Sequence, residues 1–127
     1  MDVTEHRTQE WAAVAHGASQ MARDLGARLI VALCRDGRTP RYLSKERLDR
    51  PVLGVTTSMR VCRQMAIHYG VLPVCLPDAG DLERTLAAAR QWAMQRGWLA
   101  EGQRVVIITG PAEDRFAPAA SVSWRVM

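Results

Sequence analysis

The chain has 127 residues, of which 48% are hydrophobic and 24% are charged. This length suits a single domain, and the composition excludes a chain that is disordered over most of its length. No apolar run approaches the roughly 20 residues of a membrane helix, and the polar start lacks the apolar segment of a signal peptide, so we expect a cytoplasmic domain with no membrane partner.

The net charge of +4 rests on 16 arginines and a single lysine, Lys45. The arginines are scattered along the sequence, whereas nucleic-acid-binding proteins gather them into a stripe with exposed aromatic residues, so we expect no nucleic-acid partner. The three cysteines, Cys34, Cys62 and Cys75, show no Cys-x-x-Cys spacing. We interpret them as reduced core residues rather than metal ligands or reactive thiols.

The first predicted element is an amphipathic helix from Glu10 to Leu25, whose apolar residues recur at spacings of three and four and which Gly26 closes as a C-cap. Residues 1 to about 8 are expected to be frayed. The run Leu29–Cys34 is continuously apolar, as expected for a strand that is covered on both faces in a parallel sheet.

A short helix is predicted next, with Thr39 as its N-cap, Pro40 at its first position and its end near Glu46. The run Val52–Thr56 predicts a second buried strand. Ser58 is expected to cap a helix that reaches Tyr69 and has an inner face made of Val61, Cys62, Met65, Ala66 and Tyr69.

Val71–Leu76 predicts a third strand, and its Pro73 favours an edge position. A long helix is expected from Leu82 to Arg96, with Leu82, Leu86, Ala89 and Ala93 on its inner side. Arg104–Thr109 predicts a fourth strand. The last segment, Ser121–Val126, alternates with a period of two, which implies a strand with one covered face. Strands that alternate with helices predict a three-layer α/β/α fold around a mostly parallel sheet.

Several segments resemble the C-terminal α/β domain of pyruvate kinase, in the order and spacing of that family. They are residues 27–33, Asp36-Gly-Arg-Thr39, Leu43-Ser-Lys-Glu-Arg47, Arg50-Pro-Val-Leu-Gly-Val-Thr56, Arg63-Gln-Met-Ala66, Tyr69-Gly-Val-Leu-Pro-Val74 and residues 101–110. The resemblance covers about Arg7 to Val126. It implies a five-stranded mixed sheet whose last strand is antiparallel to the other four.

The resemblance also implies that this domain has no catalytic residues and no cofactor of its own. In that family the phosphoryl-transfer residues, the magnesium ligands and the potassium site belong to a barrel domain that precedes the α/β domain, so these ions would matter only in a full kinase. The residues agree with this expectation, since the sequence has no Walker loop and only one lysine. His6, His16 and His68 share no metal-ligand spacing.

A candidate phosphate site follows from the same resemblance. Allosteric members of the family bind a phosphorylated sugar where the turn after the first strand meets a helix N-terminus, a position that attracts anions. The matching residues here are Arg35, Asp36, Gly37, Arg38 and Thr39, with Gly110 on the loop after the fourth strand. This sequence departs from the family where Cys34 and Asp36 replace small hydroxyl residues, and residues 111–119 contain no glycine. The alternative is an ordinary strand-to-helix turn.

The last strand is the candidate interface. In the family it meets its two-fold mate, so we expect a homodimer formed through Ser121, Val122, Ser123, Trp124, Arg125 and Val126. Trp124 is expected to be exposed within one chain. Arg125 and Arg115 are interpreted either as a further anion contact or as solvated charges.

Three functions remain open on the sequence. The first is a non-catalytic regulatory or oligomerisation module that binds a phosphorylated metabolite. The second is the excised part of a full pyruvate kinase, which transfers phosphate from phosphoenolpyruvate to ADP in glycolysis. The third is a small enzyme with a polar cluster of Asp36, Arg38, Thr57 and Glu113.

Overall fold

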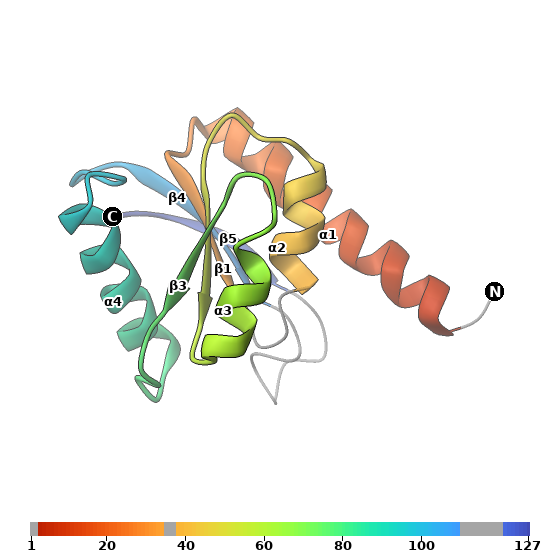
Figure 1. The fold of residues 1–127 in the computed structure, drawn as a ribbon. Coiled ribbons are helices and arrows are strands. Elements are labelled where there is room, and N and C mark those ends of the chain that lie inside the picture. The colour runs from red at the N-terminus through yellow and green to blue at the C-terminus, as the bar shows by residue number, and fades with distance from the viewer. Residues whose placement is uncertain (1–2, 35–37, 110–120) are drawn as a thin grey trace.

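The computed structural model describes residues 3–34, 38–109 and 121–127. Five strands form one sheet in the order β3-β2-β1-β4-β5 (Figure 1). The strands are β1 (Leu29–Leu33), β2 (Val52–Thr56), β3 (Val71–Cys75), β4 (Arg104–Thr109) and β5 (Ser121–Val126). The first four are parallel and β5 is antiparallel to β4, which confirms the predicted fold class.

Helices cover both faces of this sheet (Figure 1). On one face, α1 (Val3–Leu25), α2 (Arg38–Lys45) and α3 (Met59–Met65) form a core with the side chains of Ile30 and Ala32. On the other face, α4 (Leu82–Gln95) packs against Leu29 and Val31. Successive residues of β1 therefore enter opposite cores, which explains why the whole strand is apolar. No helix in the described part of the chain could span a membrane.

Gly54 lets two helices approach the sheet together. A Cβ atom at this position of β2 would lie 2.6 Å from Sδ of Met65 on α3 and 3.4 Å from Cγ of Pro40 on α2. Both helices therefore meet over the same residue of β2. The absence of a side chain at Gly54 gives α2 and α3 their close approach to the strand.

Two arginines hold the C-terminal end of α1 against the sheet. Nη1 of Arg50 donates hydrogen bonds to the carbonyl oxygens of Ala22 and Ala27, at 2.7 and 2.8 Å. Arg104 donates to the carbonyl oxygen of Leu25 at 3.0 Å. Gly26 follows with a φ of +63°, so the predicted C-cap is confirmed. Arg104 thus satisfies a carbonyl group that the helix end leaves without an intrahelical donor. Arg50 gives Ala22 a second donor, since the carbonyl of Ala22 also accepts a bond from the amide of Ala27 at 2.9 Å.

Two predicted helix starts are corrected. The helix α1 begins at Val3 rather than Glu10, because residues 3–9 carry no helix-breaking residue although the apolar period begins only at Trp11. The helix α2 begins at Arg38, so Thr39 lies inside the helix instead of serving as its N-cap. Leu43 of α2 is buried, whereas Tyr42 is only partly buried.

The predicted end of α3 at Tyr69 is also wrong. Ser58 caps the helix as expected, but the helix ends at Met65. The chain then turns through bonds from the amides of Ala66 and His68 to carbonyls three residues earlier. This turn delivers Val71 to its place beside Val52, and the strand pairing therefore overrides the helical pattern. Of the predicted inner face, only Val61 and Met65 are buried.

The helix α4 begins as a capped helix. Asp81 is its N-cap and accepts a hydrogen bond at 2.8 Å from the backbone amide of Arg84. Leu82 is exposed instead of lying on the inner side, because the buried residues of α4 begin one turn later, at Leu86.

Candidate functional site

The carboxyl ends of β1 and β2 meet at one edge of the sheet because these strands are parallel neighbours. The helix α2 follows β1 and α3 follows β2, so both helices begin at this edge. In α/β sheets, ligands bind beyond the carboxyl ends of the strands. This edge is therefore the first candidate site.

The predicted phosphate residues fall only partly within the described structure. Arg35, Asp36, Gly37 and Gly110 lie outside the described residues, and only the backbone of Arg38 is described. Thr39 is buried within α2. The first turn of α2 holds no acidic residue, so nothing in that turn opposes the attraction of a helix N-terminus for anions. The phosphate site stays a prediction.

The hydroxyl groups near the start of α3 are engaged by the chain itself. Thr56 is buried, and its Oγ1 accepts a hydrogen bond at 3.1 Å from the backbone amide of Ser58. Oγ of Ser58 accepts a bond at 3.3 Å from the amide of Val61. Thr57, which the sequence placed in a possible catalytic cluster, is exposed. Of its supposed partners, Asp36 and Glu113 lie outside the described residues, as does the side chain of Arg38.

Metal-ligating side chains do not gather in the described part of the chain, where no group of three or more His, Cys, Asp or Glu could hold an ion. His16 is engaged with a single carboxylate, since its Nδ1 lies 3.1 Å from Oε1 of Glu46.

Cys62 and Cys75 are free thiols, in agreement with the reduced state expected of them. Cys34 is buried, but Cys62 and Cys75 are only partly buried, so the description as core residues holds for Cys34 alone. Burial, and to a smaller extent the neighbouring Cys75, raises the pKa of the Cys62 thiol. A raised pKa keeps this thiol protonated and poorly nucleophilic at neutral pH.

The second candidate site is the outer edge of β5. The amide of Met127 donates to the carbonyl oxygen of Gln103 at 2.9 Å, so the backbone groups of Met127 point toward β4. Because backbone groups alternate along a strand, the amides and carbonyls of Val122, Trp124 and Val126 point away from β4. In the described part of the chain, no strand pairs with this outer edge.

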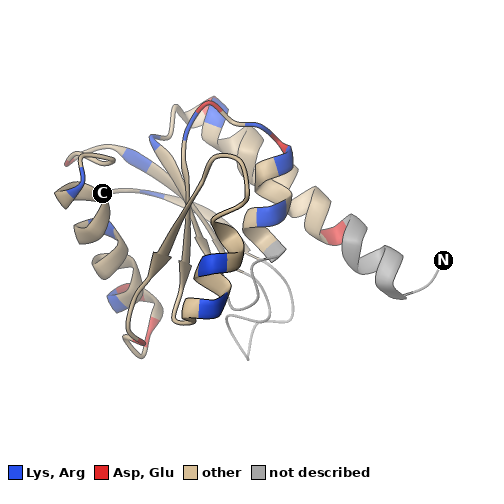
Figure 2. Cartoon of the chain, viewed as in Figure 1, with Lys and Arg blue, Asp and Glu red and all other residues tan. Residues whose placement is uncertain are grey.

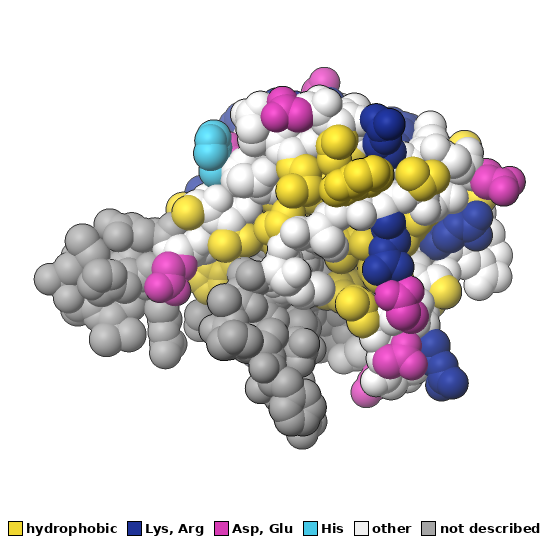
Figure 3. Space-filling view, turned by 180° about the vertical axis from the view of Figure 1, so that it is seen from behind, with side chains coloured by type: hydrophobic (Ala, Val, Ile, Leu, Met, Phe, Trp, Pro, Cys, Tyr) yellow, Lys and Arg dark blue, Asp and Glu magenta, His cyan; other side chains and the backbone are white. Residues whose placement is uncertain are grey.

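The apolar side chains of β5 are incompletely covered. Val122 packs against the core beneath α1, while Trp124 and Val126 are 48% and 57% exposed. The sequence predicted one covered face for this strand, and within a single chain that face is left half open. Figure 3, the view from behind, shows hydrophobic side chains gathered in a band on this side of the molecule, with cationic side chains beside it.

Arg125 is the residue that ties β5 to the opposite face. Its guanidinium donates two hydrogen bonds to the carboxylate of Glu83 on α4, at 2.8 and 3.1 Å. These bonds lower the pKa of the Glu83 carboxyl and raise the pKa of Arg125. Arg125 is thus an ion-pair partner rather than an isolated solvated charge. The two partners lie 42 positions apart, so the sequence carries no local signal for this pair.

Comparison with known proteins gives a consistent result. Residues 12–116 match the family model described as "Pyruvate kinase, alpha/beta domain". The chain is 35% identical over 98 residues to pyruvate kinase 2 of Synechocystis, an alignment that covers 77% of this chain and 17% of the relative. It is 32% identical over 94 residues to the pyruvate kinase of Clostridium acetobutylicum, with 74% and 20% covered.

A solved structure shares the fold. The chain superposes with a TM-score of 0.80 and 24% identity on Cryptosporidium parvum pyruvate kinase in complex with ADP, over 93% of this chain and 23% of that one. The chain therefore spans only about a fifth of the length of the relatives it matches.

Proposed function

Since the chain belongs to the pyruvate kinase α/β-domain family, we propose that it acts as a non-catalytic assembly and regulatory module, which pairs with a second copy of itself through β5. The observation that carries the proposal is the open outer edge of this strand. Three amides and three carbonyls point outward there, beside the exposed side chains of Trp124 and Val126. The expected location of the dimer is the cytoplasm.

Pairing of two β5 strands gives partners to the outward backbone groups and also covers the exposed apolar side chains. Around a two-fold axis the strands run antiparallel, and each outward amide meets a carbonyl of the mate, which joins two five-stranded sheets into one. The same contact removes Trp124 and Val126 from water. Full burial of a large apolar side chain contributes about 1.5–3 kcal/mol, which strengthens the backbone pairing.

Charge placed on this edge tests the assembly. In the variant Trp124→Glu, each copy brings a carboxylate into the interface, and we expect the dimer to weaken by on the order of a hundredfold or more. The readout is the dissociation constant from sedimentation equilibrium. The matched control is Ile67→Glu, which introduces the same charge at another exposed apolar residue, located after α3 on the side of the sheet opposite to β5. Equal dimerisation of both variants would show that the chain does not assemble through this strand.

The regulatory part of the proposal places a phosphorylated metabolite at the N-terminus of α2. Support comes from the position of that helix at the carboxyl edge of the sheet and from the lack of acidic residues in its first turn. The test is a thermal-shift titration with phosphorylated sugars, fructose 1,6-bisphosphate among them, with sulfate as the control for a generic anion effect. No shift at millimolar sugar phosphate would remove this part of the proposal.

A second candidate function is that of the α/β portion of a phosphotransferase. Its support is the similarity to proteins named pyruvate kinase, of which this chain spans about a fifth. The transfer of phosphate from phosphoenolpyruvate to ADP, with magnesium and potassium, would then rest on residues beyond these 127. Intact mass of the endogenous protein discriminates the two: a species near 14.1 kDa favours the separate module, and one several times larger favours the kinase.

A further inference from the structure

The outward surface of α2 and α3 carries four cations and no carboxylate. Arg41 and Lys45 lie on α2, Arg60 and Arg63 lie on α3, and all four are exposed. Neither helix contains an aspartate or a glutamate. We refer to these four residues as the basic face.

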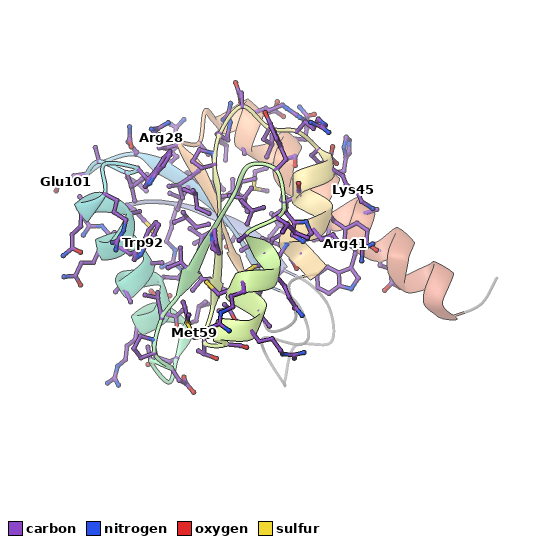
Figure 4. The ribbon with its side chains drawn as sticks, viewed as in Figure 1. Arg28, Arg41, Lys45, Met59, Trp92 and Glu101 are labelled. Carbon is purple, nitrogen blue, oxygen red and sulfur yellow. The ribbon has the colours of Figure 1, made fainter. Side chains whose placement is uncertain are left out.

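The fold assembles the basic face from residues that are distant in the sequence. The helices α2 and α3 converge over Gly54, where Pro40 and Met65 both approach the same point of β2. Figure 2 shows the cationic positions of the two helices following one another on the same side of the molecule, and Figure 4 shows Arg41 and Lys45 projecting from α2. The scattered arginines of the sequence are therefore partly gathered by the structure.

The described residues do not neutralise this face through ion pairs. Among the described residues, ion pairs join Glu46 to His16, Asp49 to Arg50, Asp81 to Arg84 and Glu83 to Arg125, and none of them includes a residue of the basic face. The acidic residue that directly follows α2 is Glu46, and its carboxylate contacts α1 instead. Four like charges on neighbouring helices repel one another, and an anionic partner relieves that repulsion.

The groups around the basic face indicate what kind of anion fits. The aromatic rings beside it already hold cations, since Nζ of Lys45 lies 5.1 Å from the ring centroid of Tyr42 and Arg47 lies 5.0 Å from that of Tyr69. Exposed apolar side chains, Met59 and Ile67, flank α3 at its two ends and are 56% and 84% exposed. Single-stranded nucleic acid binds by stacking its bases on free aromatic rings, whereas an amphipathic protein segment binds by burying aliphatic side chains. The surroundings of the basic face therefore favour a protein segment.

We propose that the basic face is a docking site for a short, acidic, amphipathic segment of a partner protein. Carboxylates of that segment bind the cations of α2 and α3, and its aliphatic residues contact Met59 and Ile67. The two helices lie over β2, while β5 forms the far edge of the sheet. This site is therefore separate from the proposed dimer contact.

A synthetic peptide tests the proposal directly on the 127-residue chain. The probe is a 12-residue peptide with the repeat Glu-Glu-Leu, compared with the same peptide in which asparagine replaces leucine and with a 12-nucleotide thymidine strand. Fluorescence anisotropy gives each dissociation constant. We expect the leucine peptide to bind several times more tightly than the asparagine peptide and the thymidine strand, and its binding to weaken as salt rises.

Charge reversal locates the binding. The triple variant Arg41→Glu, Arg60→Glu, Arg63→Glu should weaken binding of the leucine peptide by about tenfold or more, because it replaces attraction with repulsion. The control reverses Arg28, Arg84 and Arg96, which are exposed elsewhere and give the same net charge. It should change binding by less than about threefold, the scale of peripheral charge contacts.

Three results would overturn the inference. They are equal losses in the two triple variants, equal binding of the two peptides, and tighter binding of the thymidine strand through the basic face. If the glutamate variant fails to fold, as judged by circular dichroism, the milder set Arg41→Gln, Arg60→Gln, Arg63→Gln replaces it. The expected loss is then smaller but still confined to the basic face.

Discussion

The two edges of the sheet are closed in different ways. At the β3 edge, the backbone amide of Leu76 donates to the carbonyl oxygen of Thr56 on β2 at 2.9 Å. Because backbone groups alternate along a strand, the amides and carbonyls of the odd-numbered residues of β3 point away from β2. Of these residues, Val71 uses its backbone amide to donate a hydrogen bond to the carbonyl oxygen of His68, and Pro73 has no amide hydrogen. At the β5 edge, the outward residues are Val122, Trp124 and Val126, and each has a backbone amide.

The side chains of β3 are also more buried than those of β5. Val71 and Val74 of β3 are buried between α3 on one face and α4 on the other. On β5, every residue is exposed or only partly buried. Among the described residues, β3 therefore keeps one outward amide without a backbone partner, that of Cys75, whereas β5 keeps three. The β3 edge is the more nearly closed of the two, and natural sheets use such differences to limit pairing at the wrong edge.

The largest difference in stability between the two edges is expected when a valine is replaced by alanine on each of them. Val74→Ala removes two methyl groups from a closed core and should lower the free energy of unfolding by about 2 kcal/mol. Val126→Ala removes the same groups from an exposed position and should cost less than about 0.5 kcal/mol. Urea unfolding measures both changes in the Trp124→Glu background, where the dimer does not contribute. Equal costs would mean that the β5 edge is as closed as the β3 edge.

An intermediate effect is expected when the closed edge is opened. Pro73→Val restores an outward amide on β3, and this should promote association into species larger than a dimer at high protein concentration. The free energy of unfolding should change by less than about 1 kcal/mol, because Pro73 is only partly buried. Light scattering across a concentration series follows the association. A variant that stays at the wild-type size would show that Pro73 does not protect this edge.

The smallest effect concerns the ion pair that ties β5 to α4. Because Arg125 lowers the pKa of Glu83, the pair stabilises the fold above the unfolded carboxyl value of about 4.3, and this contribution is lost as the pH falls through the lowered pKa. Glu83→Gln should therefore reduce the urea midpoint slightly at pH 7 and not at acidic pH. Glu101→Gln, at another exposed glutamate, is the control. A pH-independent difference would argue against the ion pair as its cause.

The strands were the most predictable part of the fold. The limits of β2, β4 and β5 follow directly from their apolar runs and alternation, and Pro73 correctly placed β3 at an edge. Helix ends were less predictable, since the end of α3 at Met65 is set by the pairing of β3 with β2 and not by the local sequence. Strand patterns are local, whereas these limits depend on tertiary contacts.

The candidate sites were predictable only where one element carries the whole site. The interface residues lie on a single strand, and the exposure expected of Trp124 is confirmed. The partner of Arg125 lies 42 residues away, and the basic face joins two helices, so neither could be found from spacing in the sequence. Four of the six predicted phosphate residues fall outside the described structure, so that prediction still awaits its test.

Amide hydrogen exchange at two protein concentrations tests the central claim most directly, because it reads both edges of the sheet in one experiment. If β5 pairs with its mate, the amides of Val122, Trp124 and Val126 should exchange more slowly at high than at low concentration, while those of Val71 and Cys75 on β3 should not change. The claim would be contradicted if the β5 amides exchanged at the same rate at both concentrations, or if protection rose on β3 instead.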